Sequence, residues 1–143
     1  MHISSAESRV LKRCVVAITR RDGLFLAIRR GRTVAAGGRV CFPGGHIEPG
    51  EEEHQAVVRE CLEELAAPVV ATQCVWRSVT DWGTALAWWT VSLEREAVLV
   101  PHPIEVEEIF WASADQLLND PMLLDGNREF LLAVNEGRIV LSS

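Results

Sequence analysis

The sequence has no apolar run long enough to cross a membrane, and its N-terminus has no signal-peptide core. Its four cysteines form no C-x-x-C pair and no metal-finger spacing, which is typical of reduced thiols in a cytoplasm. Positive charge is not in excess, since the formal net charge is −6, so we do not expect general binding to a nucleic acid backbone. There is also no internal repeat, low-complexity tract or linker. These absences predict a cytoplasmic protein without a membrane span and without a nucleic acid polymer as partner.

The size and composition of the chain are those of one globular domain. Its 143 residues are 48% hydrophobic and 24% charged, which is ordinary for a protein that buries a core. We therefore expect residues 1–143 to form a single domain. Much of the negative charge lies in Glu48–Glu64 and Glu94–Glu108, so an anionic ligand needs a metal ion or nearby arginines to approach this surface.

Hydrophobic runs and turn residues alternate along the chain in a pattern that indicates an α/β fold. Ser113 is expected to cap a short helix, and Gly137 is expected to end the last helix. Strands with interspersed helices favour a mixed sheet sandwiched between helices. We expect strands at Val10–Thr19, Leu24–Arg29, Val40–Phe42, Val69–Thr80, Thr84–Leu93, Glu108–Ala112 and Arg138–Leu141, and longer helices at Glu51–Leu65 and Leu124–Asn135.

Three glutamates in the helix expected at Glu51–Leu65 indicate a bound cation. Glu60, Glu63 and Glu64 stand at i, i+3 and i+4, which places their side chains on one helix face. Like charges at i,i+4 cost about 0.2–0.5 kcal/mol, so folding alone does not favour this arrangement. A hard divalent ion such as Mg²⁺ takes oxygen ligands and turns the repulsion into attraction. Apolar residues on another face of the helix are expected to be buried, namely Val57, Cys61 and Leu65.

A glycine-containing loop precedes this helix. Gly44 and Gly45 follow the strand expected at Val40–Phe42, and a backbone without Cβ atoms can approach an ion or a phosphate closely. Pro49 and Gly50 then provide turn chemistry before the helix begins. The predicted unit is a strand, a glycine loop, and a helix whose acidic face points back over the loop.

These residues resemble the Nudix box, Gly-x5-Glu-x7-Arg-Glu-U-x-Glu-Glu-x-Gly-U, in which U is a bulky aliphatic residue. At residue frequencies of roughly one in fifteen, six matches arise by chance on the order of once in 10⁷ starting points. Cys61 and Ala67 replace aliphatic residues of the box, and Ala66 replaces its glycine. We expect these departures to affect the loop after the helix rather than the chemistry. The six matching residues are Gly45, Glu51, Arg59, Glu60, Glu63 and Glu64.

The resemblance to MutT-like Nudix hydrolases implies a fold and a reaction. The implied fold is an α/β/α sandwich with a mixed sheet. The implied reaction is Mg²⁺-dependent cleavage of the diphosphate linkage in a nucleoside triphosphate or another nucleoside diphosphate derivative, with Mn²⁺ as an alternative cofactor. Arg59 is implied to pair with Glu51 and to orient the other box carboxylates. The implied metal ligands are Gly45, Glu60, Glu63 and Glu64.

The group that takes a proton from the attacking water varies within the family, so two places stay open. One is the box itself, where Glu63 is the candidate. The other is the later acidic stretch, where we favour Glu105 as an added ligand or base, with Glu107 and Glu108 as rivals.

Arginines and tryptophans near the box are the candidates for substrate binding. Arg29 and Arg39 can pair with terminal phosphates through bidentate hydrogen bonds. Trp82 and Trp88 can stack on a base. Trp88 and Trp89 face opposite ways on a strand, so at most one of them reaches the site and the other belongs to the core.

Two alternative functions stay open at this point. Phe25–Arg29 and Gly38 partly resemble the signature of coenzyme A pyrophosphatases, and an ADP-ribose pyrophosphatase is a related alternative. A nucleotide-sensing Nudix-fold module that binds without cleavage is an alternative from another class, although the retained carboxylates favour an enzyme. The expected partner is a small-molecule nucleotide, and the chain is expected to be a monomer or a homodimer.

Overall fold

The computed structural model describes residues 12–142, and two four-stranded sheets form its centre. The strands of the first sheet lie in the order β5 (Gly44–His46), β1 (Lys12–Ile18), β7 (Thr84–Leu93) and β6 (Val69–Val79). In the second sheet, β3 (Leu24–Arg30) pairs with β2 (Arg20–Arg21), β4 (Val40–Cys41) and β8 (Val106–Ala112). Strands β1 and β7 run parallel, whereas β1 with β5 and β6 with β7 run antiparallel. The expected mixed sheet is therefore present.

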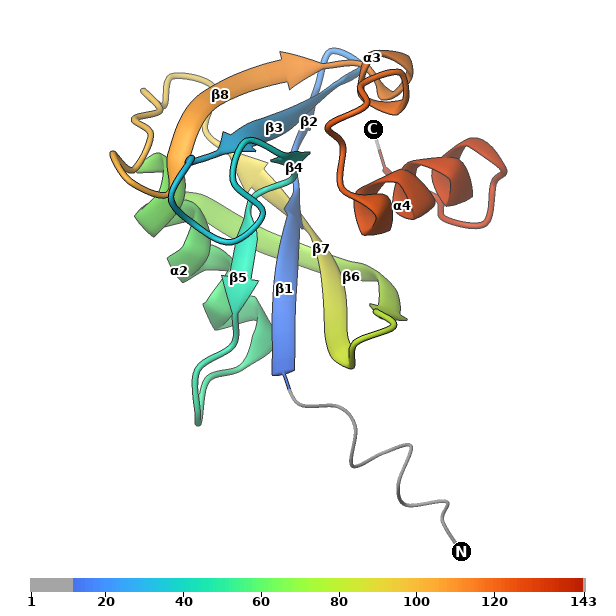
Figure 1. The fold of residues 1–143 in the computed structure, drawn as a ribbon. Coiled ribbons are helices and arrows are strands. Elements are labelled where there is room, and N and C mark those ends of the chain that lie inside the picture. Colours follow the sequence, from blue (N-terminus) through green and yellow to red (C-terminus); the bar gives the residue numbers. More distant parts are fainter. Residues whose placement is uncertain (1–11, 143) are drawn as a thin grey trace, which may run out of the picture.

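Helices cover both sides of the first sheet. Figure 1 shows α2 (Glu53–Leu65) on one side and α4 (Asp125–Asn135) on the other, with the short α3 (Ala114–Leu118) after β8. Side chains of a strand alternate between its two faces, and β1 shows the result. Its Val15 and Ala17 pack in the cluster that contains Val57 of α2, whereas Val16 and Ile18 pack in the cluster that contains Phe130 of α4. The two buried clusters confirm the α/β/α sandwich.

Most element boundaries agree with the sequence to within two residues. The helix expected from Glu51 begins at Glu53, because Glu52 acts as its N-cap in a capping box with Gln55. Ser113 caps α3 as expected and accepts a hydrogen bond from the Gln116 amide. Val10 and Leu11, at the start of the first expected strand, lie outside the described residues.

The strand expected at Arg138–Leu141 was wrong. The backbone amides of Arg138 and Ile139 donate to the Ala133 carbonyl over 2.9 and 3.3 Å, so this segment folds back onto the end of α4. Gly137 permits the reversal with a φ of 78°. Ile139 is then buried in the core beside α4. Its apolar character serves packing rather than strand pairing.

The end of α2 keeps a left-handed cap although alanine replaces the glycine of the box. Ala66 has φ 53° and ψ 31°, a conformation that costs an L-residue with a Cβ about 1–2 kcal/mol. The amides of Ala66 and Ala67 bond to the carbonyls of Leu62 and Cys61, and Ala67 is fully buried. The local loop geometry is thus retained, and the substitution takes effect as backbone strain.

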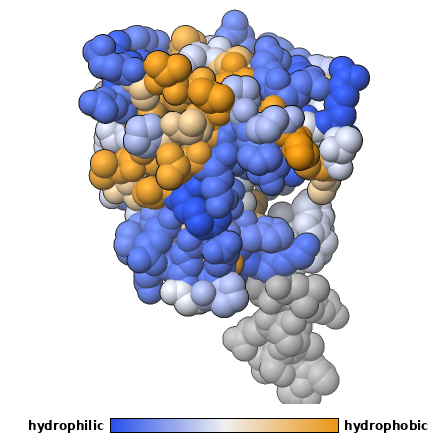
Figure 2. Space-filling view, turned by 90° about the vertical axis from the view of Figure 1, so that its left-hand side faces the viewer, coloured by the Kyte–Doolittle hydropathy of each residue, from blue (hydrophilic) through white to orange (hydrophobic). Residues whose placement is uncertain are grey.

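The segment 94–105, between β7 and β8, lies against the C-terminal end of α2. Its Val100 amide donates to the Leu65 carbonyl over 2.8 Å. Figure 2 shows the side of the molecule on which α2 and this segment lie, with a patch of apolar side chains surrounded by polar ones. Exposed apolar residues of these two segments are Leu62, Val98, Val100 and Ile104.

Among residues 12–142, none of the helices combines the length and the apolar character required to span a bilayer.

Candidate active site

A cavity of about 630 Å³ opens beside Gly44 and Gly45 of β5. Its wall contains parts of β1, β5, α2 and β7, the turn between β6 and β7, and the start of α4. Six of the eleven residues assigned to the site line it, namely Gly45, Glu60, Glu64, Glu105, Arg39 and Trp82. The remaining expected residues lie elsewhere, namely Glu51, Arg59, Glu63, Arg29 and Trp88.

The two glycines of β5 allow two carboxylates of α2 to lie against the strand. A Cβ on Gly45 would lie 2.4 Å from the carboxyl carbon of Glu60, so only glycine leaves room for this carboxylate. The Gly44 amide donates to Oε1 of Glu64 over 3.0 Å. A Cβ on Gly44 would lie 2.2 Å from the Val15 carbonyl oxygen of the paired strand β1. The loop expected at Gly44 and Gly45 is instead the strand β5, paired with β1, and the acidic face of α2 lies against this strand.

Burial and the charges of neighbouring carboxylates raise the pKa of both Glu60 and Glu64. The Glu64 side chain is buried, and burial, followed by the charge of Glu60, raises its pKa to about 8, while the Gly44 amide acts in the opposite direction. Burial also raises the pKa of Glu60, against the effect of its hydrogen bond from Arg59. The charge of Glu105 raises both pKa values. Three carboxylates thus share one cavity, and a cation between them would relieve the cost.

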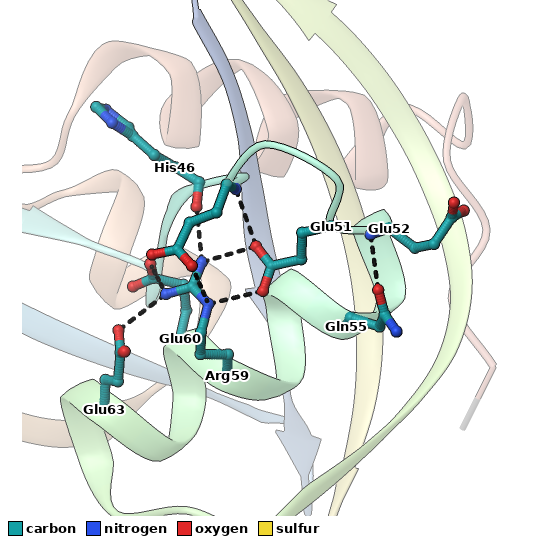
Figure 3. Close-up of polar contacts among 8 residues, drawn as sticks. His46, Glu51, Glu52, Gln55, Arg59, Glu60 and Glu63 are labelled. Carbon is teal, nitrogen blue, oxygen red and sulfur yellow. Dashed lines mark hydrogen bonds and ion pairs between the residues drawn. The ribbon is translucent and has the colours of Figure 1, made fainter.

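Arg59 connects the acidic helix face to the loop before it (Figure 3). Its Nε and Nη2 donate to the two carboxylate oxygens of Glu51 over 2.7 and 2.9 Å. Its Nη1 donates to Glu60 over 3.0 Å and to Glu63 over 2.9 Å, and Nη2 also reaches the His46 carbonyl at 2.9 Å. The pKa of Glu51 falls to about 2, mainly because of its hydrogen bonds from Arg59. Arg59 and Glu51 therefore hold Glu60 in place from outside the cavity.

The donor set fits a hard divalent cation, although its members are not gathered into a closed cage. Glu60, Glu64 and Gly45 line the cavity, and the metal-ligating atoms of such residues are carboxylate and carbonyl oxygens. Oxygen is the ligand type that Mg²⁺ takes. Within residues 12–142, no three His, Cys, Asp or Glu side chains are grouped closely enough to hold a metal ion by themselves. Glu63 is half exposed and paired with Arg59, so it contributes only after that pair rearranges. An open set of this kind leaves coordination positions for substrate oxygens and water.

Of the two arginines expected to bind phosphate, only Arg39 lines the cavity. Its guanidinium donates to the carbonyls of Met122 and Leu123 over 2.9 and 3.1 Å, which fixes its position at the rim. Arg29 instead donates to the Gly38 carbonyl and pairs with Glu108. The neighbouring Arg30 lines the cavity, because adjacent residues of a strand face opposite ways.

Of the two tryptophans expected to stack on a base, one lines the cavity and the other is buried in the core. Trp82, in the turn between β6 and β7, is 74% exposed and lines the cavity. Trp88 is fully buried, stacks on Phe130 with ring centroids 4.7 Å apart, and donates its indole N–H to Ser78. The assignment of Trp88 to substrate binding was therefore wrong, since no ligand can reach its ring. Trp89 faces the other side of β7 and donates to Glu53 of α2.

Sequence reasoning missed two polar residues at the start of α4. Asn127 is buried and its Oδ1 accepts a hydrogen bond from the Phe42 amide over 2.8 Å. Asn127 and Asp125 both line the cavity that the carboxylates of α2 also line. Because Oδ1 already accepts this hydrogen bond, the side-chain NH₂ of Asn127 is the group that can donate to a ligand. A polar pair around Gly126 in the first turn of a helix was the only sequence signal for them.

The fold and the site define an α/β/α sandwich protein with a carboxylate-lined cavity beside the two glycines of β5. The NUDIX domain model matches residues 9–134, and the chain therefore belongs to the MutT-like Nudix hydrolase family, whose members act on pyrophosphate bonds. This membership confirms the resemblance of the sequence to the Nudix box.

Relatives in sequence and in structure agree with this assignment. A CTP pyrophosphohydrolase of Escherichia coli (strain K12) is 32% identical over 111 residues, which cover 76% of this chain and 80% of that protein. Nudix hydrolase 3 of Caenorhabditis elegans is 29% identical over 112 residues, which cover 73% of this chain. The match spans 46% of that relative, less than half of its length.

Solved structures show the same fold. A MutT protein from Methanosarcina mazei Go1 superimposes with a TM-score of 0.76 at 22% identity, covering 89% of this chain and 94% of that one. The solution structure of the E. coli ORF135 protein gives a TM-score of 0.72 at 27% identity, covering 92% of this chain and 96% of that one.

Proposed function

We propose that this chain is a Mg²⁺-dependent nucleotide pyrophosphohydrolase that cleaves the diphosphate linkage of a nucleoside triphosphate or another nucleoside diphosphate derivative. The observation that carries the proposal is a pair of carboxylates, the buried Glu64 and the partly buried Glu60, held against Gly44 and Gly45 in the wall of a cavity of about 630 Å³. Ligand pockets for small molecules range from about 300 to 1,000 Å³. The repulsion between these two carboxylates does not favour folding. It would favour the binding of a metal ion, which in turn would bind the diphosphate of a substrate.

The roles of the residues follow from their positions. Glu60 and Glu64, with Glu63 and the backbone of Gly45, would hold the divalent ions, and Mn²⁺ is expected to substitute for Mg²⁺. Bound ions of this kind neutralise phosphate oxygens and lower the pKa of a water. Arg59, with Glu51, keeps Glu60 oriented. Glu105 is the residue that we propose takes the proton from the attacking water, because it lines the cavity and acts electrostatically on both Glu60 and Glu64.

Other residues that line the cavity are proposed to bind the rest of the substrate. Arg39 and Arg30 are placed to meet phosphate oxygens. Trp82 offers an exposed ring for stacking on a base. Asn127 and Asp125 supply a donor and an acceptor that can read a base edge or a ribose. The E. coli relative makes CTP the first substrate to test.

The finer assignments are proposals as well. Coenzyme A and ADP-ribose remain alternative substrates, and a nucleotide-sensing module remains the alternative without cleavage. We propose a single domain that acts as a monomer or a homodimer on a small nucleotide rather than on a nucleic acid polymer. The four free cysteines support a cytoplasmic location.

The test measures phosphate and pyrophosphate release with Mg²⁺ across CTP, other nucleoside triphosphates, ADP-ribose and coenzyme A. Glu64→Gln keeps the side-chain shape but removes a charge, so we expect kcat to fall by about 100-fold or more. Glu129→Gln makes the same change on the exposed face of α4 and is expected to leave kcat unchanged. Mg²⁺-dependent nucleotide binding without turnover would favour the sensing module. Turnover that is indifferent to Glu64→Gln would overturn the proposed mechanism.

A further inference from the structure

The segment 94–105 carries Glu105 to the cavity, and main-chain hydrogen bonds fix its path. The amides of Val100 and His102 donate to the carbonyls of Leu65 and Glu64, over 2.8 and 2.9 Å. These carbonyls belong to the last turn of α2, which has no helical partners for them. The segment therefore docks on the helix that carries the box carboxylates.

The backbone at Glu105 is held on its carbonyl side by the loop after β3. The Gly31 amide donates to the Glu105 carbonyl over 2.9 Å. A Cβ on Gly31 would lie 1.9 Å from the Ile104 carbonyl oxygen. The two segments are thus in direct backbone contact, and Gly31 is the residue type that this contact requires.

The backbone amide of Glu105 is held by the side chain of His102. Nδ1 of His102 accepts hydrogen bonds from the amides of Ile104 and Glu105, over 3.2 and 3.1 Å. The Val106 amide donates to the His102 carbonyl over 3.1 Å and closes the turn. An Nδ1 that accepts requires the ring proton of the neutral imidazole to be on Nε2. His102 thereby satisfies two adjacent turn amides with one acceptor.

Glu105 is exposed, so the side chains around it do not confine its carboxylate, and the backbone sets the point from which its side chain extends. The Glu105 charge nevertheless acts on Glu60 and on Glu64, and its residue lines the cavity. The direction of the Cα–Cβ bond follows from the backbone at residue 105, which the bonds from Gly31 and to His102 fix from both sides.

We infer that His102 is a positioning residue, whose Nδ1 holds the turn 102–105 so that the Glu105 carboxylate faces the cavity. This inference rests on the proposed function, in which Glu105 takes a proton. Loss of the acceptor leaves two turn amides without their partner and lets the turn relax. The carboxylate then moves away from the attacking water, although the substrate-binding residues stay in place. A misplacement of about 1 Å can cost about 100-fold in rate.

The test compares His102→Leu with His102→Asn. Leucine removes the acceptor, whereas Oδ1 of asparagine stands as many bonds from the backbone as Nδ1 of histidine and keeps it. With CTP and Mg²⁺, we expect His102→Leu to lower kcat by about 10- to 100-fold while KM stays within about 2-fold. We expect His102→Asn to recover most of the rate. His54→Leu, the same change on the exposed side of α2, is the control and is expected to leave kcat unchanged.

Two further readouts separate positioning from a general loss of structure. In a Glu105→Gln background, we expect His102→Leu to cause no additional loss, because both changes remove the same function. Amide hydrogen exchange at Ile104 and Glu105, measured without substrate, should accelerate in His102→Leu and stay slow in His102→Asn. Unchanged exchange in His102→Leu, or additive losses of rate, would overturn the inference about His102. Absence of turnover in the unaltered protein would instead overturn the proposed function and, with it, the catalytic role of Glu105.

Discussion

Substitution of the two adjacent glycines of β5 by alanine should have different effects, on activity at Gly45 and on stability at Gly44. A Cβ on Gly45 meets only the end of the Glu60 side chain, at 2.4 to 2.5 Å, whereas a Cβ on Gly44 meets the backbone of Val15 at 2.2 Å. The end of a side chain can move, but the backbone of a paired strand cannot move without disturbing the sheet. We therefore expect Gly45→Ala to affect activity and Gly44→Ala to affect folding.

The geometry sets the magnitudes. Ordinary contact begins at 3.4 Å, so the Glu60 carboxylate must retreat by about 1 Å in Gly45→Ala, a displacement that can lower kcat about 100-fold. Its free energy of unfolding should fall by only about 1 kcal/mol, at the low end of overpacking costs. For Gly44→Ala, in contrast, we expect a loss of about 3 kcal/mol or more, because the strand pair must separate.

The assay measures kcat with CTP and Mg²⁺ beside urea denaturation of both variants. Neither glycine has a positive φ, so alanine introduces no backbone strain that would obscure the comparison. Full activity in Gly45→Ala would show that Glu60 need not lie against the strand. Equal losses of stability in the two variants would refute the distinction between a movable and a fixed neighbour.

Three further outcomes can be checked with the same methods. Ala66→Gly relieves the left-handed strain at the end of α2 and should raise the free energy of unfolding by about 1 kcal/mol, seen as a rise in Tm of about 2–4 °C; an unchanged Tm would contradict the strain. In metal-free protein, the folded-state pKa of Glu64 (about 8, against an ordinary 4.5) means that stability is fully present below pH 4.5 and is lost as pH rises towards 8. Urea denaturation with a chelator should show this loss, and Glu64→Gln should reduce it. Trp88→Phe should lower the free energy of unfolding by about 1–3 kcal/mol and leave KM unchanged. Trp82→Ala should raise KM without a loss of stability. A raised KM in Trp88→Phe, or a loss of stability in Trp82→Ala, would contradict the two placements.

Local sequence patterns predicted those parts of the fold in which burial and spacing agree. The apolar stripe of α2 and the hydrophobic run of β1 each depend on neighbours within a few residues, and both elements formed as expected. The strand predicted at Arg138–Leu141 was wrong because Ile139 packs in the core beside α4 instead of pairing with another strand, while Val140 is exposed. The division into two sheets also depends on contacts between distant segments, and no local pattern encodes it.

The same distinction applies to the candidate site. The offsets of Glu60 and Glu64 on one helix were sufficient to place both in the cavity. The sequence did not show that Arg30 lines the cavity while Arg29 does not, or that Trp82 lines it while Trp88 is buried, because this depends on which strand face or turn meets the cavity. Asn127 was missed because it comes from a helix at the far end of the chain, and only the tertiary fold brings it to the loop after β4.

The attachment of the segment 94–105 to α2 has a consequence for how this surface can change. The bonds to Leu65 and Glu64 come from main-chain amides of Val100 and His102, which every residue except proline possesses. Side chains such as those of Val98 and Val100, which are exposed, can therefore vary without releasing the segment. The apolar surface there can vary while the segment stays attached to α2, whereas a proline at position 100 or 102 would remove one of the two amide donors that attach it.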